Sequence, residues 1–506
     1  MTPNILFIFS DQHRRASMGF WQKKEYSNAM LGVSDPVHTP NLDRLADSGI
    51  VLSEAYSSYP VCSPFRAMLF SGLYPENNGV WQNCAPGRKD ELRGDITTLT
   101  DVLADSGYSV GYIGKWHLEE PRADFDADGN YIGDRPDYKG KRYFPDGSDD
   151  SNTACWDTLI RSERCRKIDY LYAYNTHDVF RNDPKKSRLS SPHYWDKNYK
   201  RHLPPEGMWS PDFETDLAIN FLNNQNGERK GDKPYALFVS YNPPHSPYSH
   251  RDDTDHEAYD RLYSPEKPRR QNVERDDSRF LENTRIYYSH VTGIDRCVGR
   301  LLSALDGIGA ADNTIVVFTS DHGEMLGSHG LMAKNVPFEE ATAIPFVIRY
   351  PDKLSHRTDN LLITGADIMP TLLGLAGIAA PNELEGSDYS NILRTGEGDR
   401  PISALFTQPK RKGIRTHRYL LTISFGDDKS YSAPTLFDLE SDPYQMNNLP
   451  FSAIPEEELL TLRTELGTRL ALSDDPWFKK RLYPDFIIYP TKKPEKGVKN
   501  TEGNEE

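Results

Sequence analysis

The chain has 506 residues, which is more than one compact core usually holds, so we expect a large domain with a smaller one beside it. Hydrophobic residues make up 37% and charged residues 27% of the chain, as is ordinary for a soluble globular protein. The formal net charge of −15 argues against nucleic-acid binding, which needs a basic face, although a local cationic pocket could still take an anionic substrate.

Five short apolar runs predict the strands of a large, mixed but mostly parallel sheet. They are rich in Val, Ile and Phe, and their length fits strands that are buried on both faces. In chain order the runs are residues 5–9, 108–113, 235–241, 315–319 and 344–348. Helical patterns alternate with them, which predicts an α/β fold with helices on both faces and ligands near the carboxyl ends of the strands.

Helices are predicted where proline or a periodic apolar stripe marks them. Thr39-Pro40 opens the first as an N-cap followed by proline in the first turn, and Ser210-Pro211 opens a second. A third has one apolar stripe at three- and four-residue spacing, formed by Tyr287, Val291, Ile294, Val298, Leu301 and Leu305. Further along, the predicted elements are strands over residues 419–424 and 435–439 and a helix over residues 456–472.

These patterns divide the chain into a catalytic domain over residues 1–394 and a small α+β domain over residues 395–490. Within the first, residues 119–210 show no regular period and are rich in Asp, Gly, Lys, Arg, Tyr and Pro. A stretch of that length is more often functional than a plain connector, so we expect a substrate-binding insertion there. Residues 491–506 are rich in Lys, Glu and Gly, and we expect them to be disordered.

The start of the chain and its cysteines bear on the compartment. Met1-Thr2-Pro3-Asn4 leads directly into an apolar run without a basic or long apolar segment, so no signal peptide is expected. The chain as written is therefore expected in the cytoplasm, whereas a trimmed precursor would be periplasmic or secreted. No run approaches the roughly 20 apolar residues that cross a bilayer, so no membrane partner is expected. The five cysteines are odd in number and unpatterned, which does not indicate a disulfide framework.

Two of the predicted strands end in pairs of possible metal ligands. Asp11-Gln12 follows the first strand, and Asp321-His322 follows the strand over residues 315–319. Because ligands gather at the carboxyl ends of such strands, these oxygen and imidazole donors could converge on one divalent cation. Carboxylates and carbonyls suit calcium, magnesium or manganese. Each pair alone could equally cap a helix or form a turn.

Lysine and histidine follow two further predicted strands. Lys115 and His117 lie two residues apart, so in extended backbone both side chains point to the same side. The segment Pro243-Pro244-His245-Ser246-Pro247 follows the strand over residues 235–241, and its prolines fix the backbone and can aim one imidazole into a cleft. Histidine titrates near neutral pH, which suits proton transfer. The alternative interpretation is a surface lysine and two structural histidines.

The most specific pattern is Cys62-Ser63-Pro64-Phe65-Arg66, which is followed by Leu69-Phe70-Ser71-Gly72. By itself it could hold a small buried cysteine. It resembles the modification motif of the formylglycine-dependent (type I) sulfatases of the alkaline phosphatase superfamily, which is Cys-x-Pro-x-Arg followed by an apolar residue, Ser or Thr, and Gly. Further segments match that family in its order between about residue 4 and residue 449, with gaps over the insertion; they include residues 11–12, 39–43, 114–118, 243–247, 320–324, 327–334, 367–371 and 436–443.

The resemblance implies a covalent mechanism at Cys62. A formylglycine-generating enzyme would oxidise this cysteine to formylglycine (3-oxoalanine), whose hydrated form supplies the nucleophile. Arg66, Lys115 and Lys334 would place positive charge around the sulfate. His117 would orient the formylglycine and help to release sulfate from it.

The resemblance also implies a general acid and a metal site. His245 would protonate the leaving alcohol, and Asp321 would act as base for the nucleophile. The implied metal ligands are Asp11, Gln12, Cys62, Asp321 and His322. Gln12 departs from the Asp that is often second in this pair, so we expect one divalent metal, with calcium first and manganese or magnesium as alternatives.

The sequence therefore predicts hydrolysis of a sulfate ester on a sulfated carbohydrate or a smaller sulfated molecule. A phosphonate monoester or phosphodiester hydrolase of the same superfamily is the first alternative, and an unmodified, non-catalytic glycan-binding relative is the second. The carbohydrate prediction rests on cations and aromatics in the insertion, which suit the anions and apolar faces of a sulfated sugar. These residues are Arg161, Arg164, Arg166, Lys167, Arg181, Lys185, Lys186 and Arg188, with Tyr170, Tyr172, Tyr174, Tyr194 and Trp195.

Overall fold

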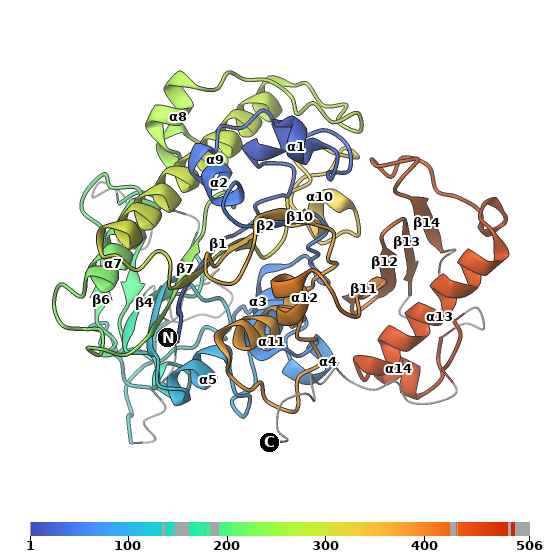
Figure 1. The fold of residues 1–506 in the computed structure, drawn as a ribbon. Coiled ribbons are helices and arrows are strands. Elements are labelled where there is room, and N and C mark those ends of the chain that lie inside the picture. The colour runs from blue at the N-terminus through green and yellow to red at the C-terminus, as the bar shows by residue number, and fades with distance from the viewer. Residues whose placement is uncertain are drawn as a thin grey trace.

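The computed structural model describes residues 2–133, 137–144, 147, 160, 162–177, 179–182, 192–425, 432, 434–483 and 487–490. The described residues form a ten-stranded sheet and a separate four-stranded sheet. Figure 1 shows the four-stranded sheet and the last helices gathered at one side of the larger, helix-covered sheet. The segment over residues 491–506, predicted to be disordered, lies outside the described residues.

The large sheet is mixed, with a parallel centre. Its strand order is β10-β2-β9-β8-β1-β7-β3-β4-β5-β6. The central strands β8, β1, β7, β3 and β4 are parallel to their neighbours within this group, whereas β9, β5 and β6 pair antiparallel. The bounds are β1 (Asn4–Ser10), β2 (Ile50–Leu52), β3 (Ser109–Lys115), β4 (Tyr170–Tyr174), β5 (Tyr194–Trp195), β6 (Arg201–His202), β7 (Tyr235–Tyr241), β8 (Thr314–Ser320), β9 (Phe346–Arg349) and β10 (Arg357–Asp359). The predicted sheet class is confirmed.

Helices cover both faces of this sheet, as the sequence predicted. Ile5, Phe7 and Phe9 of β1 pack with α3, α5, α11 and α12, whereas Leu6 and Ile8 pack with α2, α7 and α9 on the opposite face. This alternation follows from the two-residue period of a strand that is buried on both faces. The bounds are α2 (Pro40–Ala46), α3 (Cys62–Ser71), α5 (Leu99–Asp105), α7 (Ser210–Asn223), α9 (Ser278–Gly307), α11 (Gly365–Ala376) and α12 (Ser390–Thr395).

The start of α2 is capped from another helix. Thr39 occupies the N-cap position, but its side chain makes no capping hydrogen bond, contrary to our expectation. Instead the backbone amides of Asn41 and Leu42 donate to Asp295 of α9, at 3.0 and 2.7 Å. Asp295 therefore satisfies amides that a helix leaves unpaired at its start, and it joins α2 to the predicted apolar stripe of α9, which is buried.

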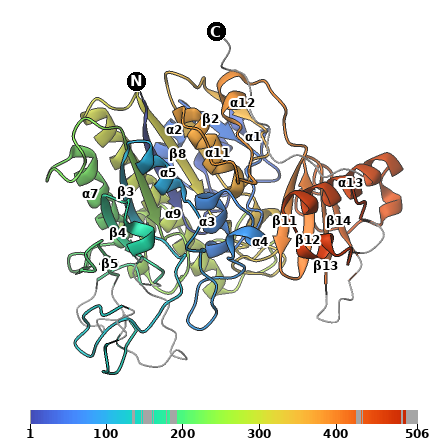
Figure 2. The same ribbon diagram turned by 90° about the horizontal axis from the view of Figure 1, so that it is seen from below.

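The smaller sheet packs against the segment that leads into α3. Its antiparallel strands are β11 (Ser403–Gln408), β12 (Arg411–Thr416), β13 (Tyr419–Ser424) and β14 (Thr435–Asp438), followed by α13 (Glu456–Leu472) and α14 (Pro476–Lys479). Tyr59, Val61 and Met68 share one apolar core with residues of this sheet and of α13. Figure 2 shows the two units seen from below, with α4 (Pro75–Asn78) beside β11 and β12.

The remaining short elements connect these layers. They are η1 (Gly19–Gln22), α1 (Lys24–Ser27), α6 (Ser162–Cys165), η3 (Arg251–Asp253), α8 (His256–Arg261), α10 (Glu339–Thr342) and η4 (Phe451–Ala453). Among the described residues, no helix combines the length and the apolar character that crossing a membrane requires.

Two strands differ from the prediction. The apolar run at residues 344–348 gives β9 only from Phe346, because Pro345 has no amide hydrogen to donate, and β9 is antiparallel to both neighbours. β4 was missed, because its five residues Tyr170–Tyr174 stand in a long polar stretch, yet they extend the parallel sheet next to β3.

Three of the predicted cations in the described part of residues 119–210 bond within the fold. Arg164 is buried and donates to the carbonyl oxygens of Leu92 and Ile96. Arg181 donates to the carbonyl oxygens of residues 207, 252 and 254, and Lys167 pairs with Asp105 at 2.7 Å. Residues 161, 185, 186 and 188 lie outside the described residues.

The aromatics of this segment surround one buried carboxyl group, on Glu214 of α7. Tyr194 and Tyr174 donate to its Oε1 at 2.9 and 3.2 Å, while Oε2 has no hydrogen-bond partner among the described residues. Burial raises the pKa of Glu214 to about 8, although both hydroxyls act to lower it. The neutral acid is therefore the form that the fold favours below that pH.

We predict that Glu214→Gln changes how stability depends on pH. The carboxyl titrates near 4.5 when unfolded and near 8 when folded, so wild-type stability falls as the pH rises through this window. Glutamine cannot ionise, so the stability of the variant should not fall over this pH range. The melting temperature of the variant minus that of wild type should therefore increase from about pH 5 to about pH 8. Differential scanning calorimetry measures this difference in melting temperature. A difference that does not change with pH would contradict the prediction.

Candidate active site

Strand register brings the predicted site residues to one edge of the large sheet. Ser10 of β1 pairs with Ser320 of β8 and with Tyr241 of β7, and Gly114 of β3 pairs with Ser240 of β7. The residues that follow these positions are Asp11, Asp321, Asn242 and Lys115. All four therefore leave the sheet at the same level, at the carboxyl ends of its parallel strands.

Arg66 holds the two carboxylates of this edge. Its Nη2 donates to Asp11 Oδ2 at 3.0 Å and its Nε donates to Asp321 Oδ2 at 3.1 Å, and none of the three side chains is exposed. The remaining donor, Nη1, is bonded to the carbonyl oxygen of Lys115 and to Ser240 Oγ, both at 2.8 Å. Every guanidinium nitrogen is thus bonded within the protein, which favours a positioning role for Arg66 over direct sulfate binding.

Cys62 is the first residue of α3 and lies one turn before Arg66. Its Sγ is 3.6 Å from Asp11 Oδ1, 3.3 Å from His322 Nε2 and 3.9 Å from Lys115 Nζ. Burial and Asp11 raise the pKa of the thiol, but the nearby Lys115, Lys334 and His322 outweigh them, so the pKa is lowered overall. The position at a helix N-terminus, beside cations, is typical of a reactive residue rather than a packing cysteine.

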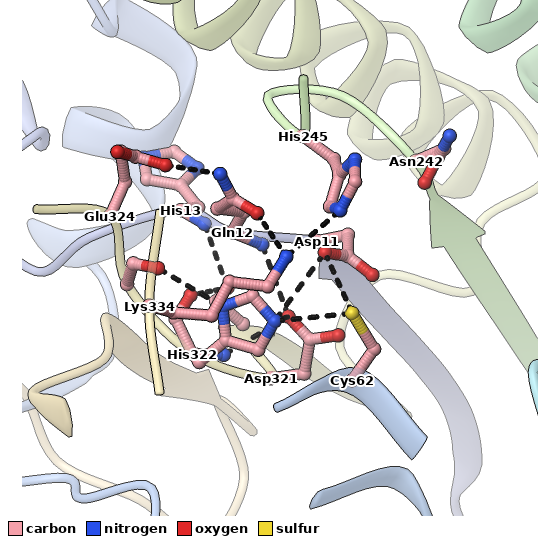
Figure 3. A network of polar contacts seen from close by, with 12 residues as sticks. Asp11, Gln12, His13, Cys62, Asn242, His245, Asp321, His322, Glu324 and Lys334 are labelled. Carbon is pink, nitrogen blue, oxygen red and sulfur yellow. Dashed lines mark hydrogen bonds and ion pairs between the residues drawn. The ribbon is translucent and has the colours of Figure 1, made fainter. Parts of the chain in front are cut away.

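Four donors form a compact set that fits one divalent cation. The ligand atoms of Asp11, Cys62, Asp321 and His322 all lie within 4.8 Å of one another, and all four residues are buried. Figure 3 shows them facing one another below His245. His322 Nδ1 lies 3.0 Å from the Gly323 carbonyl oxygen, which leaves Nε2 turned toward the set. Two carboxylates that share one buried place are chemically suited to a cation.

Gln12 follows Asp11 and holds a second cationic group beside the four donors. Its Oε1 accepts from Lys334 Nζ at 2.5 Å, and its amide nitrogen donates to Glu324 and to the hydroxyl of Tyr248. Lys334 Nζ also lies 2.9 Å from His245 Nε2. Gln12, Lys334 and His245 thus come together next to the four donors (Figure 3).

Lys115 is buried beside Cys62. Its Nζ is 2.7 Å from Asp11 Oδ2 and donates to Asn242 Oδ1 at 3.1 Å. Asn242 in turn donates to the carbonyl oxygen of His177 at 2.6 Å, which fixes its amide. The ammonium group is therefore aimed by a carboxylate and by an amide from two different strand ends.

His117 is buried in the same region with its imidazole unpaired. Neither ring nitrogen has a hydrogen-bond partner among the described residues, and its backbone has a φ of 57°. The bend starts at Gly114, where a Cβ would lie 2.1 Å from the carbonyl oxygen of Ser240, so only glycine fits. Burial, Lys115 and Arg66 lower the pKa of His117 well below its usual value, which keeps the ring neutral and able to accept a proton.

Sequence motifs could not identify the residues that support this arrangement. Asn242 immediately precedes the predicted Pro-Pro-His-Ser-Pro segment, but an asparagine at that position carries no signal by itself. Glu324 and Tyr248 anchor the Gln12 amide, and Glu324 Oε1 also accepts the backbone amides of Leu326 and Ala333. Glu324 lies three residues beyond Asp321, so only its place in the Asp-His-Gly-Glu segment could have pointed to it from the sequence.

Comparison with known proteins agrees with this geometry over most of the chain. The family model described as Sulfatase matches residues 3–378, and the model described as N-sulphoglucosamine sulphohydrolase, C-terminal, matches residues 327–471. An endo-4-O-sulfatase of Bacteroides thetaiotaomicron is 35% identical over 515 residues, covering 96% of this chain and 95% of the relative. An ulvan-active sulfatase of Formosa agariphila is 31% identical over 504 residues, covering 95% and 83%.

The solved structures give the same result for the fold. A protein from work on the metabolism of multiple glycosaminoglycans by Bacteroides thetaiotaomicron superposes with a TM-score of 0.86 at 34% identity. The match covers 97% of this chain and 100% of that protein. Both the large sheet and the smaller C-terminal sheet are therefore shared with this relative.

We predict that Arg66→Ala strongly destabilises the protein. Removing the guanidinium leaves two buried carboxylates without their shared cation, which typically costs about 3 to 5 kcal/mol. Urea unfolding measures the loss, with Arg93→Ala as the control, because Arg93 is 51% exposed in its ion pair with Asp95 and should cost no more than about 1 kcal/mol. Equal losses for the two variants would show that Arg66 does not hold the edge together.

Proposed function

The chain belongs to the sulfatase family and is a sulfuric ester hydrolase, and from this membership we propose that it cleaves a sulfate ester of a sulfated glycan at Cys62. The observation that carries the proposal is the position of Cys62, between two cationic groups and against three possible metal ligands. A packing role alone would not require a lysine and a histidine from two distant segments beside one buried thiol.

Lys115 and Lys334 are proposed to bind the sulfate. Each ammonium lies next to a group that orients it, Asp11 and Asn242 for the first, Gln12 and His245 for the second. The negative charge of a sulfate ester is spread over its oxygens during transfer, so two cations held in advance would stabilise the transition state without having to reorganise.

The nucleophile is proposed to be formylglycine, formed from Cys62 by a formylglycine-generating enzyme. When hydrated, this residue carries two hydroxyl groups, one that can attack sulfur and one whose loss of a proton can expel sulfate, which is why cysteine itself would not suffice. Asp321 would take the first proton, and the unpaired imidazole of His117 would take the second.

His245 is proposed to protonate the departing alcohol. Burial, Lys334 and Lys115 lower its pKa well below the usual value in the structure without substrate. A bound sulfate would offset both ammonium groups and so raise this pKa toward the range in which the ring can donate. Its Nδ1 lies 2.7 Å from the Ser246 carbonyl oxygen, so Nε2, which contacts Lys334 in this structure, would be the nitrogen that turns to the leaving group.

A divalent metal is proposed at Asp11, Gln12, Asp321 and His322, together with the oxygen that modification places at residue 62. When bound, it would polarise the sulfate and favour the ionised nucleophile. Replacing sulfur by oxygen removes the soft donor from the set, so we propose calcium, with magnesium or manganese as the alternatives.

The glycan part of the proposal is supported by the relatives. The endo-4-O-sulfatase is named for a 4-O-sulfate and the ulvan-active sulfatase for ulvan, and both proteins match nearly all of this chain. A 4-O-sulfated glycosaminoglycan and ulvan are accordingly the first substrates to test.

We predict that Cys62 is converted when the chain is made in a host with a maturation enzyme. Peptide mass spectrometry should show the fragment with residue 62 lighter by about 18 Da than the cysteine form, because an aldehyde replaces the thiol-bearing carbon. The matured protein should hydrolyse an aryl sulfate, and Cys62→Ala should not. Unmodified Cys62 beside a matured control sulfatase would refute the proposed chemistry, and preference for an aryl phosphonate would favour the phosphonate hydrolase alternative.

We predict that calcium raises the melting temperature of protein stripped with a chelator. A cation that binds only the folded chain stabilises it by mass action, by about 2.7 kcal/mol at a hundredfold excess over the dissociation constant. The increase should be lost in Asp321→Asn and kept in Asp169→Asn, whose carboxylate pairs with Lys230 away from the site. Differential scanning fluorimetry with calcium, magnesium and manganese measures it, and equal responses of the two variants would reject Asp321 as a ligand.

A further inference from the structure

A second pocket, lined by aromatic rings, lies between the large sheet's loops and the C-terminal sheet. Its volume is about 400 Å³. The lining residues are Trp81, Gln82, Pro409, Lys412, Phe425, Asp475, Pro476, Trp477 and Tyr483. Trp477 lies 5.2 Å from Phe425 and 6.1 Å from Tyr483, measured between ring centroids, so the rings form one wall. Trp81 and Trp477 are both partly exposed.

The charged groups of this pocket are already neutralised. Lys412 is 5% exposed and pairs with Glu76 and with Asp475, each at 3.0 Å, and it also donates to Thr407 Oγ1. Its ammonium therefore has little capacity left for an anion. The polar group at the rim is the exposed amide of Gln82, so the lining favours an uncharged ligand with an apolar face and hydroxyl groups.

One wall of the pocket is hydrogen-bonded to the segment that carries Cys62. The carbonyl oxygen of Trp81 accepts the hydroxyl of Tyr59 at 2.5 Å. Two residues further along this loop, Asn83 accepts the backbone amide of Ser63 at 3.1 Å. The ring of Trp81 is thus held by a loop that contacts the chain on both sides of the nucleophile.

The opposite wall is hydrogen-bonded to the segment that carries Lys334. Pro409 follows Gln408, whose amide nitrogen donates to Asn335 Oδ1 at 2.6 Å. Asn335 is next to Lys334, and its backbone amide donates to the carbonyl oxygen of Pro60 at 3.2 Å. Each wall of the pocket is therefore connected by a hydrogen bond to a segment that carries part of the proposed sulfate site.

We propose that this pocket is an accessory subsite that binds an uncharged ring face of a sugar residue in the substrate chain, at a distance from the residue that loses sulfate. This inference rests on the proposed function and extends it to substrate length. Trp81 and Trp477 stack on the ring, and Gln82 bonds to its hydroxyl groups. The pocket therefore favours an oligosaccharide over a small sulfate ester at the same catalytic site.

The test compares substrates that do and do not reach the pocket. The probes are an aryl sulfate and 4-O-sulfated glycosaminoglycan di- and hexasaccharides, with sulfated ulvan oligosaccharides as a second series. Trp477→Ala should lower kcat/KM on hexasaccharides about tenfold, as expected for the loss of one stacking contact, and should change the aryl sulfate value less than about twofold. Trp477→Phe should restore most of the loss, because it keeps a ring.

Controls separate stacking from folding. Gln82→Ala changes an exposed side chain and should reduce hexasaccharide turnover in the same direction. Leu460→Ala on α13, 52% exposed in the same C-terminal unit, should leave every substrate unaffected. An identical preference for hexasaccharides in wild type and in both pocket variants would overturn the subsite.

A binding measurement tests the subsite independently of the proposed catalytic function. Isothermal titration of the desulfated hexasaccharide should give heat with wild type and about tenfold weaker binding with Trp477→Ala. If the matured wild type hydrolyses no sulfate ester, the proposed function fails, and the titration alone then decides the subsite. Equal affinity, or no binding to either protein, would reject the subsite even if the enzyme is an active sulfatase.

Discussion

Two carboxylates without any exposure to water stand side by side at the end of the large sheet, and the active-site region depends on their neutralisation. The pairing of β1 with β8 brings Asp11 and Asp321 together, and Arg66 bonds to both. Because Arg66 lies one helical turn after Cys62, the same contact fixes the start of α3 against the sheet. Lys115 adds a second positive charge on Asp11. The position of Cys62 is thus set by charge pairs that the fold cannot lose without leaving a buried charge unpaired.

The sequence was sufficient for elements whose period or length is distinctive. β7, β13 and α13 cover the predicted residues 235–241, 419–424 and 456–472. The sequence was not sufficient for features that depend on contacts between distant segments. β4 is a five-residue tyrosine-rich strand that becomes recognisable only by its pairing with β3. The cap of α2 likewise comes from Asp295, far along the chain, although Thr39 holds the local signal.

The candidate site follows the same division between local and long-range information. Motifs at strand ends gave Lys115, His245 and the four-donor set, since parallel strands deliver their carboxyl ends to one edge. Direction was not predictable, because a motif does not say where a side chain points. Gln12 follows Asp11 directly, and the motif does not reveal that its side chain contacts Lys334, Tyr248 and Glu324. The cations of residues 119–210 match the composition of a glycan-binding surface, and the contacts of Arg164, Arg181 and Lys167 add a role within the fold that composition does not reveal.

The hydrogen bond from Gln408 to Asn335 has an evolutionary consequence. It couples the last residue of β11 to the neighbour of Lys334, so the C-terminal sheet is part of the frame around the proposed sulfate-binding cation. A recombination that exchanged this sheet between two such chains would therefore also replace a contact that holds the Lys334 segment in place.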